Sequence, residues 1–272
     1  MLPNNINIDQ LCLIARKAGS EILSVYDADI KVETKHDGSP LTLADKNAHD
    51  LIERCLNELT PDIPVLSEES IHIIGDKRLD WPQYWLVDPL DGTKEFIKRN
   101  GEFTVNIALI KQGKPVVGVV YAPVLETIFY AVKGVGAFKQ IKTATMTPIS
   151  SKILDLENVK VVASRSHMSD EVKQFKSALE SKAQSVELIS MGSSLKLCLI
   201  ADGSADYYPR FGLTSEWDTA AAQCVVEAAG GLVVDSAGVD ICYTKKDILN
   251  PWFLVIADPS VQVDFSGYQE NR

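Results

Sequence analysis

The sequence lacks the cysteine pattern of a disulfide framework or of a zinc site. Its five cysteines are odd in number and widely spaced, and they include no CxxC pair. Most of them lie in apolar stretches, where a free thiol packs as a small hydrophobic group. The four histidines show no zinc-type spacing either. We therefore expect reduced thiols and a reducing compartment.

Long apolar runs are also missing. No uninterrupted apolar segment approaches the ~18 residues that a membrane-spanning helix needs. The first residues have neither the basic stretch nor the apolar core of a signal peptide. These absences predict a cytoplasmic protein without an integral membrane segment. Peripheral contact with the cytoplasmic face of the inner membrane stays open.

Positive charge is scarce, with 27 Lys and Arg against 37 Asp and Glu and a net charge of −10. An acidic surface repels polyanions, so polymeric nucleic acid is not an expected partner. A small phosphorylated molecule remains compatible, provided that metal ions and a few basic side chains line its site. The 272 residues are 46% hydrophobic, which suffices for a large buried core.

Hydrophobic periodicity divides the chain into two parts. The first part has two amphipathic helices, over 8–26 and after Thr42, and then β-rich runs over 103–132 that are typical of an antiparallel meander. From about residue 158 strands alternate with helices, which favours a layered α/β arrangement. We take the polar stretch 139–157 as the region between them. The prediction is one compact unit with an α+β half (1–140) and an α/β half (141–272).

The most informative segment is WLVDPLDGTKEF, residues 85–96. An apolar strand leads into a turn that brings Asp88 and Asp91 to one side and exposes the Leu90 carbonyl. Gly92 permits close backbone approach, and Thr93 stands where a helix would begin. Carboxylates and carbonyls are the ligands of a hard cation such as Mg²⁺, and helix N–H groups favour phosphate. The segment thus indicates a metal-plus-phosphate site, although a polar surface turn would have a similar composition.

Three further acidic residues occur at the ends of predicted elements. Glu68 follows a short apolar strand, Asp218 opens an Ala-rich helix, and Asp45 lies in the first turn of the helix after Thr42. Each has a simple structural explanation: a solvated acidic loop for Glu68, a helix cap for Asp218, and a helix-dipole partner for Asp45. Their combination with the Asp88–Thr93 segment makes a shared site the stronger hypothesis.

Taken together, these segments resemble the inositol monophosphatase superfamily of Mg²⁺-dependent, lithium-sensitive phosphatases. The likeness covers nearly the whole chain. Within the superfamily, residues 85–103, GSSLK (192–196) and YPRFG (208–212) are similar to bacterial 3'(2'),5'-bisphosphate nucleotidases of the CysQ type. The resemblance implies a layered α-β-α-β-α sandwich. It also implies hydrolysis of the 3'-phosphate of adenosine 3',5'-bisphosphate to AMP during sulfate assimilation, with phosphoadenylyl sulfate as a further candidate substrate.

The resemblance also implies residue roles. Two or more Mg²⁺ ions would be held by Glu68, Asp88, the Leu90 carbonyl, Asp91 and Asp218, with Asp88 bridging. Asp45 and Thr93 would activate the attacking water, and Glu68 would assist the catalysis. Glu68, Leu90, Asp91, Gly92, Thr93 and Asp218 would also contact the substrate.

A substrate with two phosphates needs cations away from the metals. Arg210 suits a second phosphate through its bidentate fork, and Lys196 and Ser193 follow Gly192 at a helix start. His167 would contact the nucleotide, as in the nucleotidase relatives. Alternatives are an inositol or sugar monophosphatase on the same scaffold and a non-catalytic metal- or nucleotide-binding protein. The expected partner is a small molecule, and either a monomer or a homodimer fits.

Overall fold

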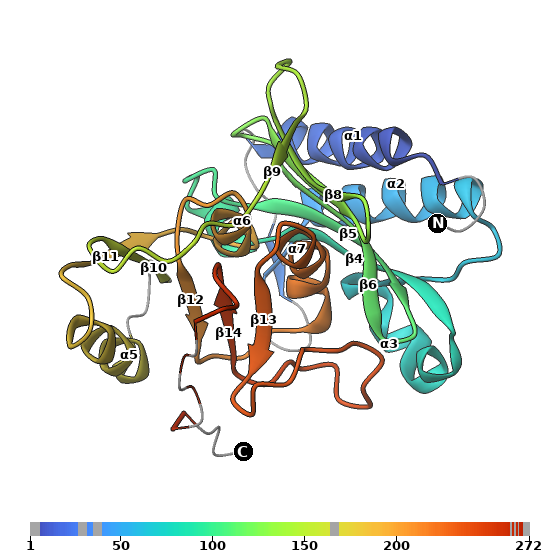
Figure 1. Ribbon diagram of the computed structural model, residues 1–272. Coiled ribbons are helices and arrows are strands. Elements are labelled where there is room, and N and C mark those ends of the chain that lie inside the picture. Colours follow the sequence, from blue (N-terminus) through green and yellow to red (C-terminus); the bar gives the residue numbers. More distant parts are fainter. Residues whose placement is uncertain are drawn as a thin grey trace.

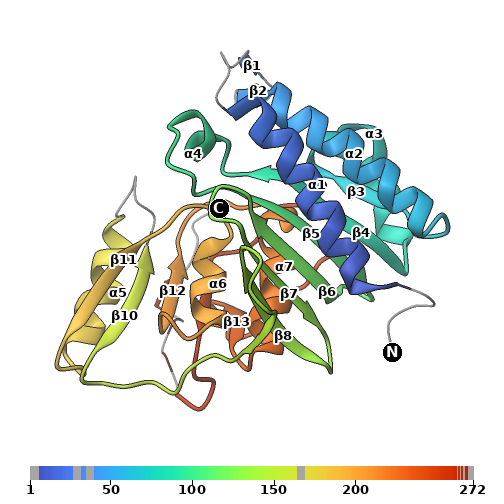
Figure 2. The same ribbon diagram turned by 90° about the horizontal axis from the view of Figure 1, so that it is seen from above.

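The computed structural model describes residues 6–26, 32–34, 40–163 and 169–261, together with Val263, Phe265, Gly267 and Tyr268. Two β-sheets alternate with three layers of helices (Figures 1 and 2). Helices α1 and α2 form one outer layer, α6 and α7 lie between the sheets, and α5 forms the other outer layer. The predicted layered α-β-α-β-α sandwich is confirmed.

The first half of the chain builds a seven-stranded sheet, which we call the large sheet, in the order β3-β4-β5-β6-β7-β8-β9. Strands β3 and β4 are parallel, and every later neighbour is antiparallel, as the predicted meander requires. A short antiparallel pair, β1 and β2, stands apart from it. The elements are α1 (Ile8–Tyr26), β1 (Val32–Thr34), β2 (Pro40–Thr42), α2 (Leu43–Leu59), β3 (Val65–Ser67), η1 (Glu68–Ser70), α3 (Ile71–Ile74), η2 (Gly75–Asp80), β4 (Gln83–Asp91), α4 (Thr93–Ile97), β5 (Thr104–Lys111), β6 (Lys114–Ala122), β7 (Thr127–Val132), β8 (Gly136–Ile141) and β9 (Thr147–Ile149).

The second half builds a five-stranded mixed sheet, which we call the small sheet, in the order β11-β10-β12-β14-β13. Strand β10 is parallel to both of its neighbours, whereas β14 is antiparallel to β12 and β13. The elements are β10 (Val159–Ala163), α5 (Asp170–Glu180), β11 (Val186–Ser190), α6 (Leu195–Ala201), β12 (Tyr207–Arg210), α7 (Glu216–Ala228), β13 (Leu232–Asp235) and β14 (Phe253–Ile256).

Three hydrophobic cores fill the spaces between the five layers. The apolar faces of α1 and α2 pack on one face of the large sheet, where Trp85 and Ile107 are buried. The opposite face of the large sheet packs on α6 and α7, which also cover the inner face of the small sheet. Phe175 and Leu179 of α5 cover the outer face of the small sheet. Helix α7 is therefore enclosed by protein on both sides, which explains its apolar composition.

A row of small residues across the large sheet forms the surface on which α7 packs. The row runs through register partners on four adjacent strands, namely Ala108, Gly118, Ala131 and Ala137. Helix α7 presents Ala220, Ala221, Ala222 and Cys224, all buried, in the layer between the sheets. Small side chains on both elements allow the helix backbone to come very close to the sheet.

The structure differs from the sequence-based expectation over residues 139–157. Residues 139–157 were expected to be irregular, but they contain the end of β8 and the whole of β9, both in the large sheet. Strand β9 is too short and too exposed to show the alternation that identifies a strand, and it contains Pro148. The division of the chain at residue 140 stays a prediction. Among the described helices, none is long and apolar enough to cross a membrane.

Candidate functional site

The segment identified from the sequence ends the central strand β4. Asp88 lies opposite Asn106 of β5 and Asp91 lies opposite Thr104, with an irregularity in register between the two aspartates. This irregularity, at Pro89, allows both carboxyl groups to reach the same cavity. Asp88 is almost fully buried, and its Oδ1 accepts a hydrogen bond from the Leu90 N–H at 3.1 Å. Gly92 has a φ of +96°, and α4 begins at Thr93, as predicted.

Asp218 comes to this site from the other half of the chain, in the first turn of α7. Its Oδ2 accepts a hydrogen bond from the Ser215 N–H at 2.9 Å, so the residue does cap its helix. The Asp218 side chain can therefore cap α7 and belong to the acidic site at the same time. Because α7 is seated against the large sheet, its first turn lies beside the end of β4.

Asp88, Asp91 and Asp218 form a tight carboxylate cluster. One oxygen from each of them lies within 4.8 Å of the others. Burial, together with repulsion from Glu68, Asp91, Asp218 and Asp45, raises the pKa of Asp88 well above its ordinary value. Burial and repulsion from Asp91 and Glu68 raise the pKa of Asp218 to about 8. Buried carboxylates at such distances require a positive charge, and oxygen donors fit a hard divalent cation.

The remaining predicted acidic residues lie around this cluster. Glu68 opens η1 and lines the same cavity of about 450 Å³, together with Leu90, Gly92 and Thr93. Asp45 is fully buried in the first turn of α2, close enough for its charge to act on Asp88. The Thr93 hydroxyl donates a hydrogen bond to the Leu90 carbonyl at 3.4 Å.

A second cavity, of about 270 Å³, adjoins the first and shares six lining residues with it, namely Asp91, Gly92, Lys94, Glu95, Thr214 and Asp218. This cavity is lined by the three residues predicted to bind the second phosphate, namely Ser193, Lys196 and Arg210. Arg210 donates hydrogen bonds to the Gly212 and Leu213 carbonyls, at 3.2 and 2.9 Å, which hold its guanidinium in place. The Lys196 ammonium lies 5.6 Å from the centre of the Tyr208 ring. The cavity thus joins an acidic end to a basic one.

Sequence reasoning missed several residues of this cavity. Lys94 and Glu95 of α4, Lys98 directly after α4, and Tyr208 of β12 also line it. The two lysines are spaced i, i+4 directly after Gly-Thr, which places them on one face of the helix. This spacing was visible in the sequence. Tyr208 lies in the YPRFG segment that carries the family resemblance, but its contact with Lys196 could not be read from the sequence, because Lys196 lies on a different element.

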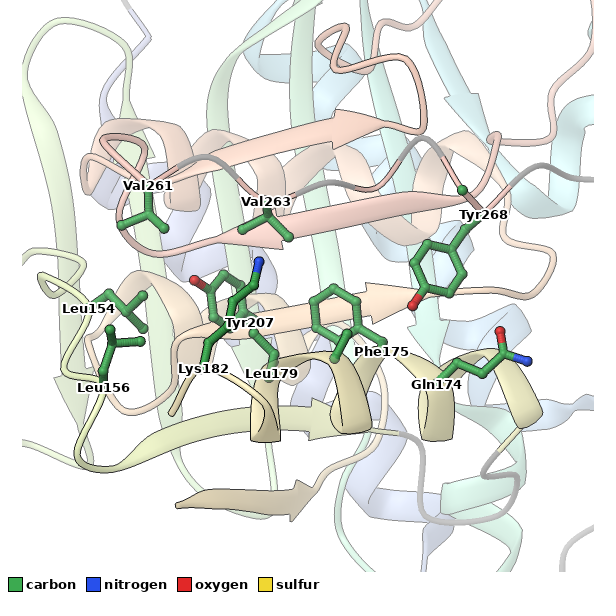
Figure 3. A pocket seen from close by; sticks show the side chains of 12 residues that line it. Leu154, Leu156, Gln174, Phe175, Leu179, Lys182, Tyr207, Val261, Val263 and Tyr268 are labelled. Carbon is green, nitrogen blue, oxygen red and sulfur yellow. The ribbon is translucent and has the colours of Figure 1, made fainter. Parts of the chain in front are cut away.

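One predicted residue and one further cavity remain to be placed. His167 lies outside the described residues. An apolar cavity of about 660 Å³ opens between α5 and the C-terminal segment, lined by residues such as Leu154, Phe175, Tyr207 and Tyr268 (Figure 3). It shares no lining residue with the two cavities around the carboxylate cluster. Its lining residues include Gln174 and Lys182 but no carboxylate.

Comparisons with known proteins identify relatives over nearly the whole chain. The sequence matches the inositol monophosphatase family over residues 7–260. It is 50% identical over 251 residues to the 3'(2'),5'-bisphosphate nucleotidase CysQ of Salmonella typhimurium, covering 91% of this chain and 98% of that protein. The same enzyme of Escherichia coli K12 is 49% identical over the same shares.

Solved structures give the same result. A crystal structure of CysQ from Bacteroides thetaiotaomicron, a bacterial member of the inositol monophosphatase family, superposes with a TM-score of 0.80 at 45% identity, covering 92% of this chain and 96% of that one. The extragenic suppressor protein suhB from Bartonella henselae has a TM-score of 0.73 at 27% identity, with 93% of each chain covered. This chain therefore belongs to the inositol monophosphatase family.

Proposed function

We propose that this protein is a Mg²⁺-dependent 3'(2'),5'-bisphosphate nucleotidase. It hydrolyses the 3'-phosphate of adenosine 3',5'-bisphosphate to AMP and phosphate, and phosphoadenylyl sulfate is a second candidate substrate. The observation that carries the proposal is the joining of the carboxylate cluster to a cavity lined by Lys196 and Arg210. The similarity to 3'(2'),5'-bisphosphate nucleotidases, at 49–50% identity over 91% of the chain, supports the same conclusion.

Two or more Mg²⁺ ions fit the donor set of Glu68, Asp88, the Leu90 carbonyl, Asp91 and Asp218. The close, buried carboxylates and the raised pKa values of Asp88 and Asp218 support this assignment. When bound, such ions lower the pKa of a water molecule and neutralise the charge of a transferred phosphoryl group. In the proposed division of work, the half 1–140 supplies most of these ligands, and the half 141–272 supplies Asp218 and most substrate contacts.

Asp45 and Thr93 are the proposed pair that handles the attacking water. The Thr93 hydroxyl orients the water, and Asp45 takes up the proton through that hydroxyl. The position of Thr93 at the start of α4 supports this role, because its hydroxyl already reaches the Leu90 carbonyl beside the cluster. The charge of Asp45 acts on Asp88, which supports its proximity.

Arg210, Lys196 and Ser193 are proposed to hold the second phosphate. Two hydrogen bonds to backbone carbonyls fix the Arg210 guanidinium, and other N–H donors of its five remain for an anion. Lys196 is largely buried against Tyr208, so a charged phosphate in the cavity would pair with it. His167 is proposed as a nucleotide contact. The substrate is a small molecule, and the proposed compartment is the cytoplasm.

The test is phosphate release from a panel of substrates with Mg²⁺. We expect adenosine 3',5'-bisphosphate to have a much higher kcat/KM than inositol monophosphate. Arg210→Ala should raise KM for the bisphosphate by at least about tenfold and leave turnover of a nucleoside 3'-monophosphate nearly unchanged. Equal or better use of inositol monophosphate would favour an inositol phosphatase on the same scaffold. Millimolar Li⁺ is expected to inhibit.

Asp91→Asn separates the enzyme from a non-catalytic binding protein. The substitution removes the charge of one proposed ligand and keeps its shape, so activity should fall by orders of magnitude while the fold is retained. Circular dichroism and the unfolding midpoint provide the control for folding. A wild-type protein that releases no phosphate from any member of the panel would contradict the proposed activity.

A further inference from the structure

We propose that Ser194 and Asn106 are positioning residues that set the spacing between Asp91 and Asp218. The inference rests on the proposed function, since it concerns how this chain prepares its cation site. Asp91 ends β4, whereas Asp218 belongs to α7, and no covalent geometry links these two elements. The packing of α7 on the large sheet brings the two residues together, and side chains that contact both can then fix their separation.

The Asp91 carboxylate is held through one of its two oxygens. Oδ2 accepts hydrogen bonds from the Ser194 N–H at 2.6 Å and from the Asn106 amide at 3.3 Å, and it contacts the Ser194 hydroxyl at 2.7 Å and the Thr104 hydroxyl at 3.4 Å. Within the described part of the chain, all hydrogen bonds of this carboxylate go to Oδ2. Oδ1 is thereby left for a cation, in a fixed orientation.

Ser194 connects this oxygen to α7. Its Oγ lies 2.7 Å from the Asp218 backbone carbonyl as well as 2.7 Å from Asp91 Oδ2. The Asn106 amide donates a hydrogen bond to the same Oγ at 2.9 Å. A serine hydroxyl has one hydrogen to donate, and Asn106 occupies its acceptor side, so the hydrogen is directed toward Asp91 or Asp218. Asn106 thus orients Ser194, and Ser194 joins the two aspartates.

The loop that carries Ser194 has little freedom to move. Ser193 has a φ of +46°, and a Cβ added at Gly192 would stand 2.7 Å from the Glu102 carbonyl oxygen. Ser194 is 1% exposed, and so is Asn106, which lies on β5 opposite Asp88. A rigid support for a ligand carboxylate is what a precise cation site requires, and loss of such a support typically costs about 10–100-fold in metal affinity.

The experiment is Mn²⁺ binding, measured by electron paramagnetic resonance of free Mn²⁺ without substrate. Ser194→Ala removes the hydroxyl but keeps the backbone N–H bond to Asp91, and Asn106→Ala removes the amide. Each should raise the Mn²⁺ Kd by about 10–100-fold. The Mn²⁺ Kd of the double variant should exceed that of the weaker-binding single variant by no more than a few-fold, because both residues act through Asp91. The Mg²⁺ concentration for half-maximal activity should rise similarly, with KM for nucleotide at saturating Mg²⁺ unchanged.

Ser151→Ala is the matched control. The Ser151 hydroxyl donates to the Ala229 carbonyl at 3.2 Å, the same kind of bond at the other end of α7. It should leave the Mn²⁺ Kd unchanged. Wild-type protein that binds no Mn²⁺ would overturn the proposed function itself. If the wild-type protein bound Mn²⁺ and both Ser194→Ala and Asn106→Ala bound it with the wild-type Kd, only the positioning role would be overturned. Both variants could instead bind Mn²⁺ more weakly and show a correspondingly large fall of the unfolding midpoint in EDTA. General destabilisation would then explain the weaker binding, and the positioning role would also be overturned.

Discussion

Gly118 of β6 lies directly against Ala221 of α7. A Cβ at Gly118 would overlap the Ala221 carbonyl oxygen and would stand 2.8 Å from the Cβ of Cys224. Neither neighbour can move aside, because one is helix backbone and the other is buried. We expect Gly118→Ala to lower the free energy of unfolding by about 1–3 kcal/mol or more, since overpacking must push α7 off the sheet. Chemical denaturation measures this loss.

Displacement of α7 should also reach the site, because Asp218 lies in its first turn. The same variant is therefore expected to bind Mn²⁺ more weakly. Gly267→Ala is the matched control, because no atom of the other described residues, its chain neighbours apart, lies within 4 Å of a Cβ at that position. If Gly118→Ala were as stable as wild type, the close packing of α7 on the large sheet would be contradicted.

A buried ion pair between Arg78 and Glu216 also holds the start of α7 in place. Arg78 and Glu216 are 2% and 0% exposed and approach to 3.5 Å, and the Lys245 ammonium also binds Glu216, at 2.7 Å. Removal of one partner leaves a buried charge poorly compensated. We expect Arg78→Met to cost about 3 kcal/mol, the lower end of the usual range for a broken buried pair, because Lys245 remains. Urea denaturation in EDTA measures the cost.

Lys114→Met provides the comparison for this measurement. Lys114 and Asp240 lie 3.3 Å apart, but their side chains are 35% and 53% exposed. An exposed pair of this kind contributes at most about 1 kcal/mol. Equal losses for the two variants would show that Arg78 contributes no more than a surface cation does.

Local patterns in the sequence were enough to predict most of the fold. Helix α1 was predicted with its observed bounds, and the meander of β5, β6 and β7 was predicted from turn residues and apolar runs. Strand β9 was missed because a three-residue, largely exposed strand that contains proline has no readable period. The order of strands in the small sheet was also beyond prediction, because β12 inserts beside β10 through long-range pairing.

Part of the candidate site was also predictable from the sequence, and part was not. Asp88 and Asp91 were predictable because strand, turn and helix start follow one another in the chain. The proximity of Asp218 was predictable only through the family resemblance, because it depends on the packing of α7. Ser194 and Asn106 were not identified as site residues, since a serine before a helix and an asparagine in a strand are common. Their importance appears only when the hydrogen bonds to Asp91 are seen.

The five cysteines, all within the described residues, are free and differ strongly in exposure. Burial raises the pKa of Cys12 to about 12 and also raises the pKa of Cys198 and of Cys224. Cys242 is exposed. Because thiolates react and buried thiols stay protonated, a disulfide reagent at pH 8 should modify Cys242 first. Cys242→Ser should abolish the fast phase, and denaturant should release all remaining thiols. Fast labelling of Cys198 would contradict the packing of α6.

The carboxylate cluster predicts how pH and metal act on stability. Without metal, the pKa of Asp218 is about 8 and that of Asp88 is also raised. A carboxyl group whose pKa is raised in the folded state stabilises the fold below its ordinary pKa, and this contribution is lost as pH rises through the folded value. The metal-free protein should therefore lose stability between about pH 5 and pH 8, apart from the effects of other groups.

A bound cation removes this loss, because it replaces the proton as the partner of the carboxylates. The increase in Tm on adding Mg²⁺ to protein in EDTA should consequently be larger at pH 8 than at pH 6. Differential scanning fluorimetry at the two pH values measures it. Asp88→Asn, which reduces the repulsion in the cluster, should raise the Tm of the metal-free protein at pH 8 and abolish most of the Mg²⁺ effect. An Mg²⁺ effect that is the same at both pH values, or that survives in Asp88→Asn, would mean that Asp88 and Asp218 do not share a cation.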